Sequence, residues 1–317
     1  MKIVFMGTPD FAVGALKALL AAGHEITAVV TQPDKAKGRS GKLSFSPVKE
    51  CALEAGIPVL QPVRIKRPEA VKELKKYEAD VFVVAAFGQI LSKEILDMPR
   101  YGCLNIHASL LPKYRGSSPI QWAVINGEEK TGVTIQQMNE GIDTGDILYR
   151  KEIYLDKKET GESLFARLSV LGAEAITEAL SLLEKGELTA VPQKEEDATY
   201  TVMLSKAMGE IDWNKSAEEI ERLVRGLNSW PSAYTFFEGK QLKIWEADVG
   251  IPVNALSEPA ICREKPGTVV AIEKNRFAVA CETEVLWINS LQLEGKKRMC
   301  THDFLLGNAM QTGMILG

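Results

Sequence analysis

The run Asp80-Val81-Phe82-Val83-Val84-Ala85-Ala86 decides the fold class of this chain. It is β-branched and almost continuously apolar, which is typical of a strand in a parallel sheet whose two faces are both covered. Apolar runs also alternate along the chain with segments whose apolar residues recur at helical spacing. Predicted strands cover residues 2–6, 24–30 and 59–60, and predicted helices cover residues 11–22, 46–55 and 68–77. This alternation predicts right-handed crossovers and a Rossmann-like α/β domain with a mostly parallel sheet.

The same domain continues beyond this run. Residues 103–107 form the next predicted strand, residues 132–138 and 146–154 are closer to a hairpin, and residues 162–184 form a long amphipathic helix. Because sites in open α/β sheets lie at the carboxyl ends of strands, the end of the strand at residues 103–107 is the place to look for function.

The last third of the chain has a different pattern. A polar, irregular stretch precedes a predicted helix at residues 216–227, and five short alternating strands follow at residues 234–237, 242–247, 267–272, 277–280 and 285–293. Five short strands with glycine-containing turns indicate a small antiparallel β-barrel of OB-like form. We therefore expect a catalytic domain at residues 1–187, a linker at residues 188–206 and a second domain at residues 207–317.

Composition and charge limit the classes of protein to which this chain can belong. The chain has 317 residues, 45% of them hydrophobic and 25% charged, which fits a globular protein large enough for two domains. The net charge of −4 argues against a general polyanion binder, because such affinity comes mainly from Lys and Arg. One local exception is a predicted mobile basic loop between Pro33 and Lys49, which includes Arg39 and Lys42.

Cysteine usage and hydropathy indicate the compartment. Five cysteines are an odd number, and no two are spaced as Cys-x-x-Cys, which favours free thiols in a reducing cytosol. No apolar run has the length of a signal peptide or a membrane span, so we expect a cytoplasmic protein with no membrane partner.

The candidate active site begins with Asn105-Ile106-His107-Ala108-Ser109-Leu110-Leu111-Pro112. Asn105 and His107 are two residues apart, so their side chains share one face of an extended strand. Asp143, in the run Gly141-Ile142-Asp143-Thr144-Gly145-Asp146, lies on a loop from which it can orient the imidazole. A carboxamide, an imidazole and a carboxylate together are suited to acyl transfer.

Each of these residues also has a purely structural explanation. A single histidine on a strand is more often a hydrogen-bonded core residue, and an Asp between turn residues often forms an Asx turn. Cys103 is a conceivable nucleophile, but a thiol among apolar strand residues is usually inert packing. A dinucleotide site after the first strand is disfavoured, since Gly7-Thr8-Pro9 lacks the Gly-x-Gly-x-x-Gly pattern.

The combination Asn-x-His, then Ser-Leu-Leu-Pro, then Asp-x-Gly resembles the signature of the formyltransferases that use 10-formyltetrahydrofolate. The resemblance extends over nearly the whole chain. Within this family, the chain is similar to the members that act on a charged tRNA. It rests on residues 4–12, on Gln32-Pro33-Asp34, and on Tyr114-Arg115-Gly116. It continues through Pro119-Ile120-Gln121-Trp122, Leu204-Ser205-Lys206, Ile211-Asp212-Trp213 and Trp230-Pro231.

The resemblance implies transfer of a formyl group from folate to the α-amino group of methionine esterified to initiator tRNA, with no metal. It assigns the catalytic roles to Asn105, as oxyanion donor, and to His107 and Asp143, as an imidazole and the carboxylate that favours its protonated form. It assigns folate binding to Phe87, Gly88, Gln89, Ile90, Leu91, Ser109, Leu110, Leu111 and Pro112. It assigns tRNA contacts to Arg39, Lys42 and Lys206, and the protein is expected to act as a monomer.

Two alternatives stay open at the level of sequence. A sibling formyltransferase acting on an amino sugar nucleotide or a purine precursor would share the chemistry of Asn105, His107 and Asp143, yet would need neither the basic loop nor a second domain of this size. A non-catalytic tRNA-binding protein would retain these residues as structural remains, which their intact set argues against.

Overall fold

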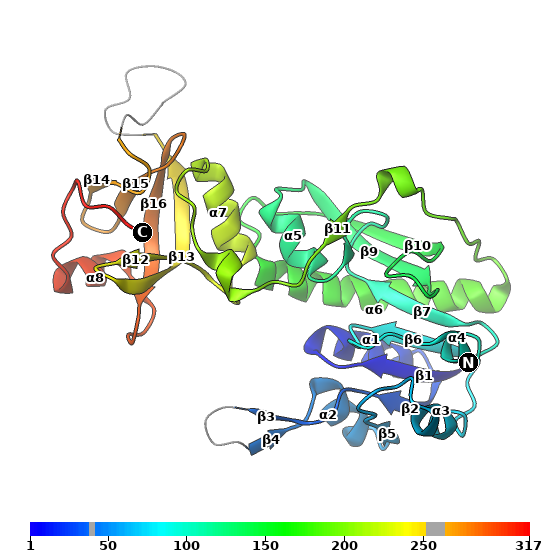
Figure 1. Ribbon diagram of the computed structural model, residues 1–317. Coiled ribbons are helices and arrows are strands. Elements are labelled where there is room, and N and C mark those ends of the chain that lie inside the picture. Colours follow the sequence, from blue (N-terminus) through cyan, green and yellow to red (C-terminus); the bar gives the residue numbers. More distant parts are fainter. Residues whose placement is uncertain (38–41, 252–263) are drawn as a thin grey trace. The chain divides into compact units, whose positions relative to one another are not determined.

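A computed structural model describes residues 1–37, 42–251 and 264–317 of the chain (Figure 1). The chain divides into two compact units. The first contains residues 1–119, 130–154 and 165–201, and the second contains residues 120–129, 155–164 and 202–317. The last boundary between the units, after residue 201, therefore falls within the expected linker at residues 188–206, and most of that linker belongs to the first unit. Each unit is described by itself below.

The first unit is built on a seven-stranded sheet in the order β10-β9-β7-β6-β1-β2-β5 (Figure 1). Its strands are β1 (Lys2–Gly7), β2 (Glu25–Val30), β5 (Val59–Leu60), β6 (Val81–Ala85), β7 (Cys103–His107), β9 (Lys130–Gln137) and β10 (Ile147–Tyr154). The first five are parallel, and β9 and β10 are antiparallel to their neighbours. The parallel strands follow the order 3-2-1-4-5 of a doubly wound fold, which confirms the prediction of a Rossmann-like sheet.

The run that decided the fold class becomes β6, in the middle of this sheet, and all five of its residues are buried. A strand covered on both faces exposes no polar face, which explains why this run has no alternation of apolar and polar residues. The apolar composition of β6 thus correctly indicates a strand buried on both faces of the sheet.

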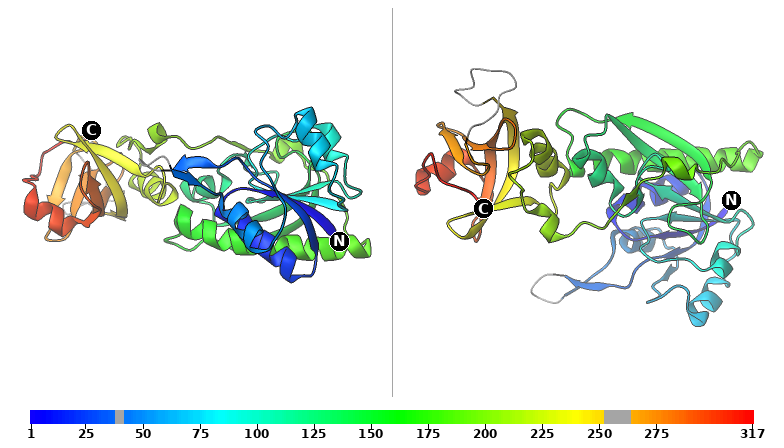
Figure 2. Two further views of the ribbon diagram at one scale, coloured as in Figure 1. Left: turned by 90° about the horizontal axis from the view of Figure 1, so that it is seen from below. Right: turned by 45° about the horizontal axis from the view of Figure 1, so that its top comes forward.

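Helices cover both faces of the first sheet. They are α1 (Asp10–Ala21), α2 (Pro47–Glu54), α3 (Pro68–Leu74), α4 (Lys93–Leu96) and α6 (Gly161–Lys185), of which residues 165–185 belong to this unit. The rings of Phe11 on α1 and Phe165 on α6 meet edge to face at 5.7 Å. Figure 2 shows α6 running along one face of the sheet, where Gly172 allows close approach to Ile106 of β7.

The opposite face of the sheet packs against α3 and α4 through one apolar cluster. Cys103 of β7 belongs to that cluster. Since strand side chains alternate between faces, Asn105 and His107 share the face of Cys103, while Ile106 points to α6. The strand thus brings both polar candidates to the same side, beyond the end of the apolar cluster.

Two short strand pairs in this unit were not predicted. β3 (Lys35–Lys37) and β4 (Lys42–Ser44) pair antiparallel, so these parts of the predicted basic loop are strands. β8 (Arg115–Gly116) pairs in parallel with β11 (Tyr200–Thr201), which follows the 3-10 helix η1 (Glu195–Asp197). Strands of two or three residues are too short to show a period of two, and their pairing depends on distant partners.

The second unit contains an antiparallel sheet in the order β12-β13-β16-β15-β14, with β17 paired to β16. Its strands are β12 (Ala233–Phe237), β13 (Lys240–Gly250), β14 (Val269–Ile272), β15 (Phe277–Ala280), β16 (Val285–Leu293) and β17 (Met299–Cys300). Its helical elements are α5 (Pro119–Ile125, with Pro119 in the first unit), η2 (Lys206–Gly209), α7 (Ala217–Gly226) and α8 (Thr301–Gly307). The predicted helix and all five predicted strands are present.

The C-terminal residues connect the two edges of this sheet. The N–H of Leu316 donates to the carbonyl of Gly267, and the N–H of Val269 donates to the carbonyl of Met314. The N–H of Gly317 donates to the carbonyl of Phe236 on β12, at 3.1 Å. The segment thereby bridges β14 and β12, which fits the expected OB-like barrel.

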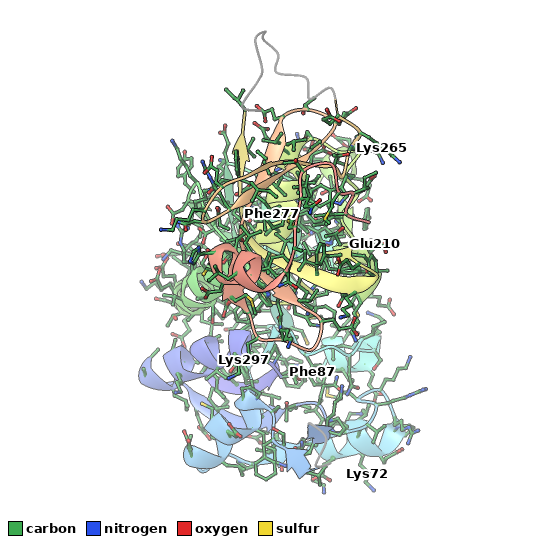
Figure 3. The ribbon with its side chains drawn as sticks, turned by 90° about the vertical axis from the view of Figure 1, so that its left-hand side faces the viewer. Lys72, Phe87, Glu210, Lys265, Phe277 and Lys297 are labelled. Carbon is green, nitrogen blue, oxygen red and sulfur yellow. The ribbon has the colours of Figure 1, made fainter. Side chains whose placement is uncertain are left out.

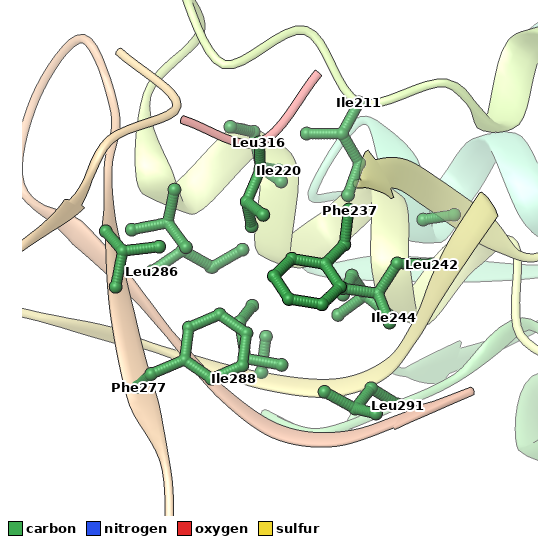
Figure 4. Close-up of a cluster of buried hydrophobic side chains, with 14 of the residues drawn as sticks. Ile211, Ile220, Phe237, Leu242, Ile244, Phe277, Leu286, Ile288, Leu291 and Leu316 are labelled. Carbon is green, nitrogen blue, oxygen red and sulfur yellow. The ribbon is translucent and has the colours of Figure 1, made fainter. Parts of the chain in front are cut away.

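The interior of the second unit is filled by one apolar cluster (Figure 4). Phe237 and Phe277 contribute large rings to it, and Phe237 meets Phe304 of α8 edge to face at 5.6 Å. Figure 3 shows Phe277 within the strands, whereas the exposed Lys265 lies at the periphery. Alternation of buried and half-buried residues along β12 follows from a sheet with one covered face.

Candidate functional site

The end of β7 presents the first two candidate residues on one face of the sheet. Asn105 lies opposite Gln136 of β9, and His107 lies opposite Thr134. Asn105 is half-buried and His107 is 6% exposed. The predicted spacing therefore has the predicted effect, because both side chains leave the same face of one strand.

The third candidate, Asp143, lies on the loop between β9 and β10 with a positive φ of 53°. Its Oδ1 accepts from Gln136 Nε2 at 2.7 Å and from Asn105 Nδ2 at 3.4 Å. Its Oδ2 accepts from the N–H of Gly116 at 2.9 Å and lies 3.5 Å from His107 Nδ1. The carboxylate is thus the centre on which the carboxamide and the imidazole converge.

Two oxygen atoms orient the imidazole of His107. Nε2 lies 2.9 Å from the carbonyl oxygen of Tyr114, and Nδ1 faces the Asp143 carboxylate. A neutral ring can donate from only one nitrogen, whereas an imidazolium donates from both. The ring is therefore held between two acceptor oxygens, and a ring N–H can stabilise negative charge that develops nearby.

The amide of Asn105 is suited to polarise a carbonyl group. Its Nδ2 carries two N–H groups, and its contact with Asp143 is long, at 3.4 Å. The side chain is half-buried, so a ligand can reach it without unfolding the strand. A positioned N–H donor beside an imidazole is an arrangement that can stabilise a tetrahedral acyl-transfer intermediate.

Cys103 does not have the surroundings of a nucleophile. Its thiol is fully buried and points at the carbonyl oxygens of Ile95 and Leu96, at 3.7 and 3.9 Å. Burial raises the pKa of Cys103 to about 12, so the thiol is protonated near neutral pH. The cysteine is packing, as its apolar neighbours in the sequence indicate.

The residues expected to line a folate pocket fall in two segments. In the first, Phe87 and Leu91 are buried in the apolar cluster beside α3 and α4, while Ile90 is 69% exposed. Gly88 has a positive φ of 78°. The amide of Gln89 bridges the N–H of Ile65 and the carbonyl of Pro62, at 2.6 and 3.0 Å. The segment is therefore anchored by its alternate residues and leaves Ile90 free to meet a ligand.

The second segment, Ser109–Pro112, follows β7 directly and is fixed over β9. Thr134 Oγ1 donates to the carbonyl of Ser109 at 2.7 Å and accepts from the N–H of Leu111 at 3.1 Å. Ser109 and Leu111 are buried, whereas Leu110 and Pro112 are half-buried. Because Thr134 lies opposite His107, this turn is held beside the catalytic candidates.

The candidate tRNA contacts are distributed over the chain. Arg39 lies outside the described residues, and Lys42 lies in β4 with a side chain outside the described part. Lys206 is exposed at the start of η2 in the second unit. Lys49, at the end of the basic segment, is instead bound to Asp34 at 2.6 Å and to Gln61 at 2.8 Å. The hydrogen bond from Lys49, together with one from Gln61 Nε2 to Asp34 Oδ1 at 2.8 Å, holds the pKa of Asp34 below its usual range.

Sequence reasoning missed the groups that surround Asp143. Gln136 is 2% exposed and contacts the carboxylate directly, and its Oε1 is buried without a partner among the described residues. Gly116 contributes only its backbone, and Gln193 reaches the loop from the expected linker. The one available signal was that Gln136 lies on β9, the strand that leads into the loop of Asp143. This position becomes informative only once the register between Gln136 and Asn105 is known.

Within the described ranges, no cluster of three or more His, Cys, Asp or Glu side chains has the arrangement of a metal site. No helix in the same ranges has the length and apolar character needed to cross a bilayer. 

Comparison with known proteins identifies the family. Residues 1–180 match the formyl transferase family, and residues 203–309 match the formyl transferase C-terminal domain. A methionyl-tRNA formyltransferase of Lachnospira eligens is 57% identical over 317 residues, covering 100% of both chains. One from Agathobacter rectalis is 52% identical over 313 residues, covering 99% of this chain and 98% of its own. The chain belongs to the methionyl-tRNA formyltransferase family.

As a member of the methionyl-tRNA formyltransferase family, the protein is an enzyme that transfers formyl groups. The fold is shared more widely. An N-formyltransferase from Helicobacter canadensis, solved with folinic acid and dTDP-3-aminofucose, superposes with a TM-score of 0.66 at 16% identity, covering 94% of this chain and 100% of its own. Full-length identities above 50% to methionyl-tRNA formyltransferases do not favour a sugar-modifying or a non-catalytic protein.

Proposed function

We propose that this protein transfers the formyl group of 10-formyltetrahydrofolate to the α-amino group of methionyl initiator tRNA, for the initiation of translation. The observation that carries the proposal is the convergence of Asn105 and His107 on Asp143, in a chain whose full-length relatives are methionyl-tRNA formyltransferases. Formyl transfer is assigned to residues 1–187 and acceptor binding to residues 207–317, joined by residues 188–206.

The reaction is a direct acyl transfer. The uncharged α-amine attacks the formyl carbon, the carbonyl π electrons move to oxygen, and the tetrahedral intermediate collapses with cleavage of the bond to N10 of folate. One amine proton is lost and one proton is gained at N10. Asn105 donates a hydrogen bond to the oxyanion, the His107 imidazolium stabilises it and mediates proton transfer, and Asp143 holds the ring.

The formyl donor binds against the segments Phe87–Leu91 and Ser109–Pro112. Their exposed parts combine apolar side chains such as Ile90 with backbone groups, which suit a flat heterocycle that needs both contact and hydrogen bonds. The anchoring of Gln89 and the fixation of the second segment on Thr134 support this assignment, because a binding wall must keep its shape.

The acceptor is a tRNA, although the protein is acidic overall. Arg39 and Lys42 in the basic segment and the exposed Lys206 are assigned to phosphate contacts, which supply most nonspecific affinity for nucleic acid. The protein acts as a monomer in the cytoplasm; the four described cysteines are free thiols, which suits a reducing compartment.

A competition assay tests the proposal. Purified protein receives 10-formyltetrahydrofolate together with methionyl initiator tRNA, an amino sugar nucleotide and a purine-precursor ribonucleotide amine. We expect formyl-methionine on the tRNA and no formylation of the other amines. Formylation of only the sugar or the nucleotide would contradict the proposed acceptor. Binding of tRNA without any formylation would contradict the proposed formyl transfer.

A further inference from the structure

The loop that carries Asp143 is held by a residue that neither family match covers. Gln193 lies between the matched regions, which end at residue 180 and resume at residue 203. Its Nε2 donates to the carbonyl oxygens of Asp143, at 2.8 Å, and of Gly145, at 2.6 Å. Both N–H groups of this one amide are therefore used to hold the catalytic loop.

The other half of the same amide is held by a buried guanidinium. Arg115, which is 1% exposed, donates from Nε to Oε1 of Gln193 at 3.0 Å. Its Nη1 donates to Glu195 and to the hydroxyl of Tyr200, at 2.8 and 2.7 Å. A guanidinium has only donors, so it requires the oxygen of Gln193 to face it and thereby directs the nitrogen to the loop.

Backbone pairing fixes Gln193 on both sides. Val191 exchanges two hydrogen bonds, at 2.8 and 2.9 Å, with Ile147, the first residue of β10. Beyond Gln193, β11 pairs with β8, and Gly116 of β8 donates its N–H to the Asp143 carboxylate. Arg115 and Gly116 therefore act on the loop from two directions, one through Gln193 and one directly.

The loop needs such support because Asp143 has a left-handed backbone conformation, with φ of 53°. This conformation is unfavourable for a residue other than glycine, and it persists where the surroundings impose it. Its carboxylate must also keep its distance to His107, since misplacement by about 1 Å can cost roughly a hundredfold in rate.

We propose that Gln193, oriented by Arg115, is a positioning residue for Asp143: its amide fixes the loop that aims the carboxylate at His107 and Asn105. The inference rests on the proposed function of the site. It gives the expected linker a role in the reaction, because the segment that leads to the second unit holds the catalytic loop of the first.

Gln193→Glu separates positioning from mere anchoring. The glutamate keeps an acceptor for Arg115 but cannot donate to the two loop carbonyls, so the segment stays attached while the loop loses its support. We expect kcat to fall on the order of tenfold to a hundredfold, with KM for tRNA and for folate within about threefold of wild type. Lys194→Ala, an exposed neighbour in the same segment, serves as the matched control and keeps the wild-type kcat.

The decisive comparison uses Asp143→Asn as the background. If Gln193 acts through Asp143, Gln193→Glu lowers kcat by less than about twofold further in that background, whereas an independent structural effect multiplies. Wild-type kcat in Gln193→Glu, or an equal loss in both backgrounds, overturns the inference while leaving the proposed function intact. Absence of formylation by the wild-type enzyme overturns the proposed function itself.

Discussion

At the scale of single residues, the proposed mechanism assigns the most direct role to Asn105, as the amide donor to the developing oxyanion. Asn105→Ala removes that donor and leaves the position of His107 on the strand unchanged. The expected loss in kcat is on the order of a hundredfold to a thousandfold, the usual effect of one oxyanion-hole donor. Steady-state kinetics with methionyl initiator tRNA measure it, and thermal unfolding serves as the control for folding. A kcat within a few-fold of wild type would remove Asn105 from the mechanism.

Sequence alone could predict the catalytic candidates but not what holds them. Asn105 and His107 are two residues apart on a strand, so local geometry places them together. Gln136 and Gln193 contact Asp143 through a strand register and a distant segment. Glutamine is common and uncharged, and neither contact leaves a pattern in the sequence around it, so these residues become visible only in the fold.

At the scale of elements, the start of α7 has a complete capping box. Ser216 Oγ accepts from the N–H of Glu219, and the Glu219 carboxylate accepts from the N–H of Ser216. We expect Ser216→Ala to cost about 1 kcal/mol of stability in the second unit. Ser205→Ala is the matched control, because Ser205, in the same unit, is the N-cap of η2 without a side-chain capping bond. Urea unfolding followed by signals of the second unit compares the two variants, and equal losses would contradict this role for the box.

The same box predicts a pH dependence. Hydrogen bonds from the side chain and backbone of Ser216 hold the pKa of Glu219 below its ordinary value. A carboxyl group whose pKa is lowered by folding stabilises the native state above its unfolded pKa of about 4.3, and this contribution is lost as the pH falls through the lowered value. The stability difference between wild type and Ser216→Ala should therefore shrink below about pH 4.

Elements were predictable from sequence according to their length and the range of their contacts. β15 and β16 were predicted with the residues they have, and α6 within one residue at each end, because a period of two or 3.6 is clear over such runs. The short pair β8 and β11 was missed, although its residues join positions 85 apart and border the site. Short strands show no period, and the polar composition after residue 187 is equally typical of a linker.

At the scale of the whole molecule, an acidic chain must bind an acidic nucleic acid. The net charge is −4, and acidic residues outnumber basic ones after residue 207 as well. Composition therefore gave no support to a tRNA partner, and the prediction depended on the resemblance of motifs along the chain. Few basic contacts should then account for a large share of the electrostatic affinity, so single lysines and arginines become worth testing.

Lys206 is the best described of these positions, since it is exposed at the start of η2, where the chain has entered the second unit. If it contacts a phosphate, Lys206→Ala raises KM for tRNA severalfold and lowers the slope of log(kcat/KM) against log[salt] by about 1, as expected for one lost ion contact. KM for folate should not change.

Lys72→Ala is the control for net charge alone, because Lys72 is also an exposed lysine, on α3 of the first unit (Figure 3), and its substitution removes the same charge. The same series with Arg39→Ala tests the basic segment, for which the same fall of about 1 in the salt slope is expected. Equal salt slopes for Lys206→Ala, Lys72→Ala and wild type would show that Lys206 makes no phosphate contact and that acceptor binding rests on other parts of the chain.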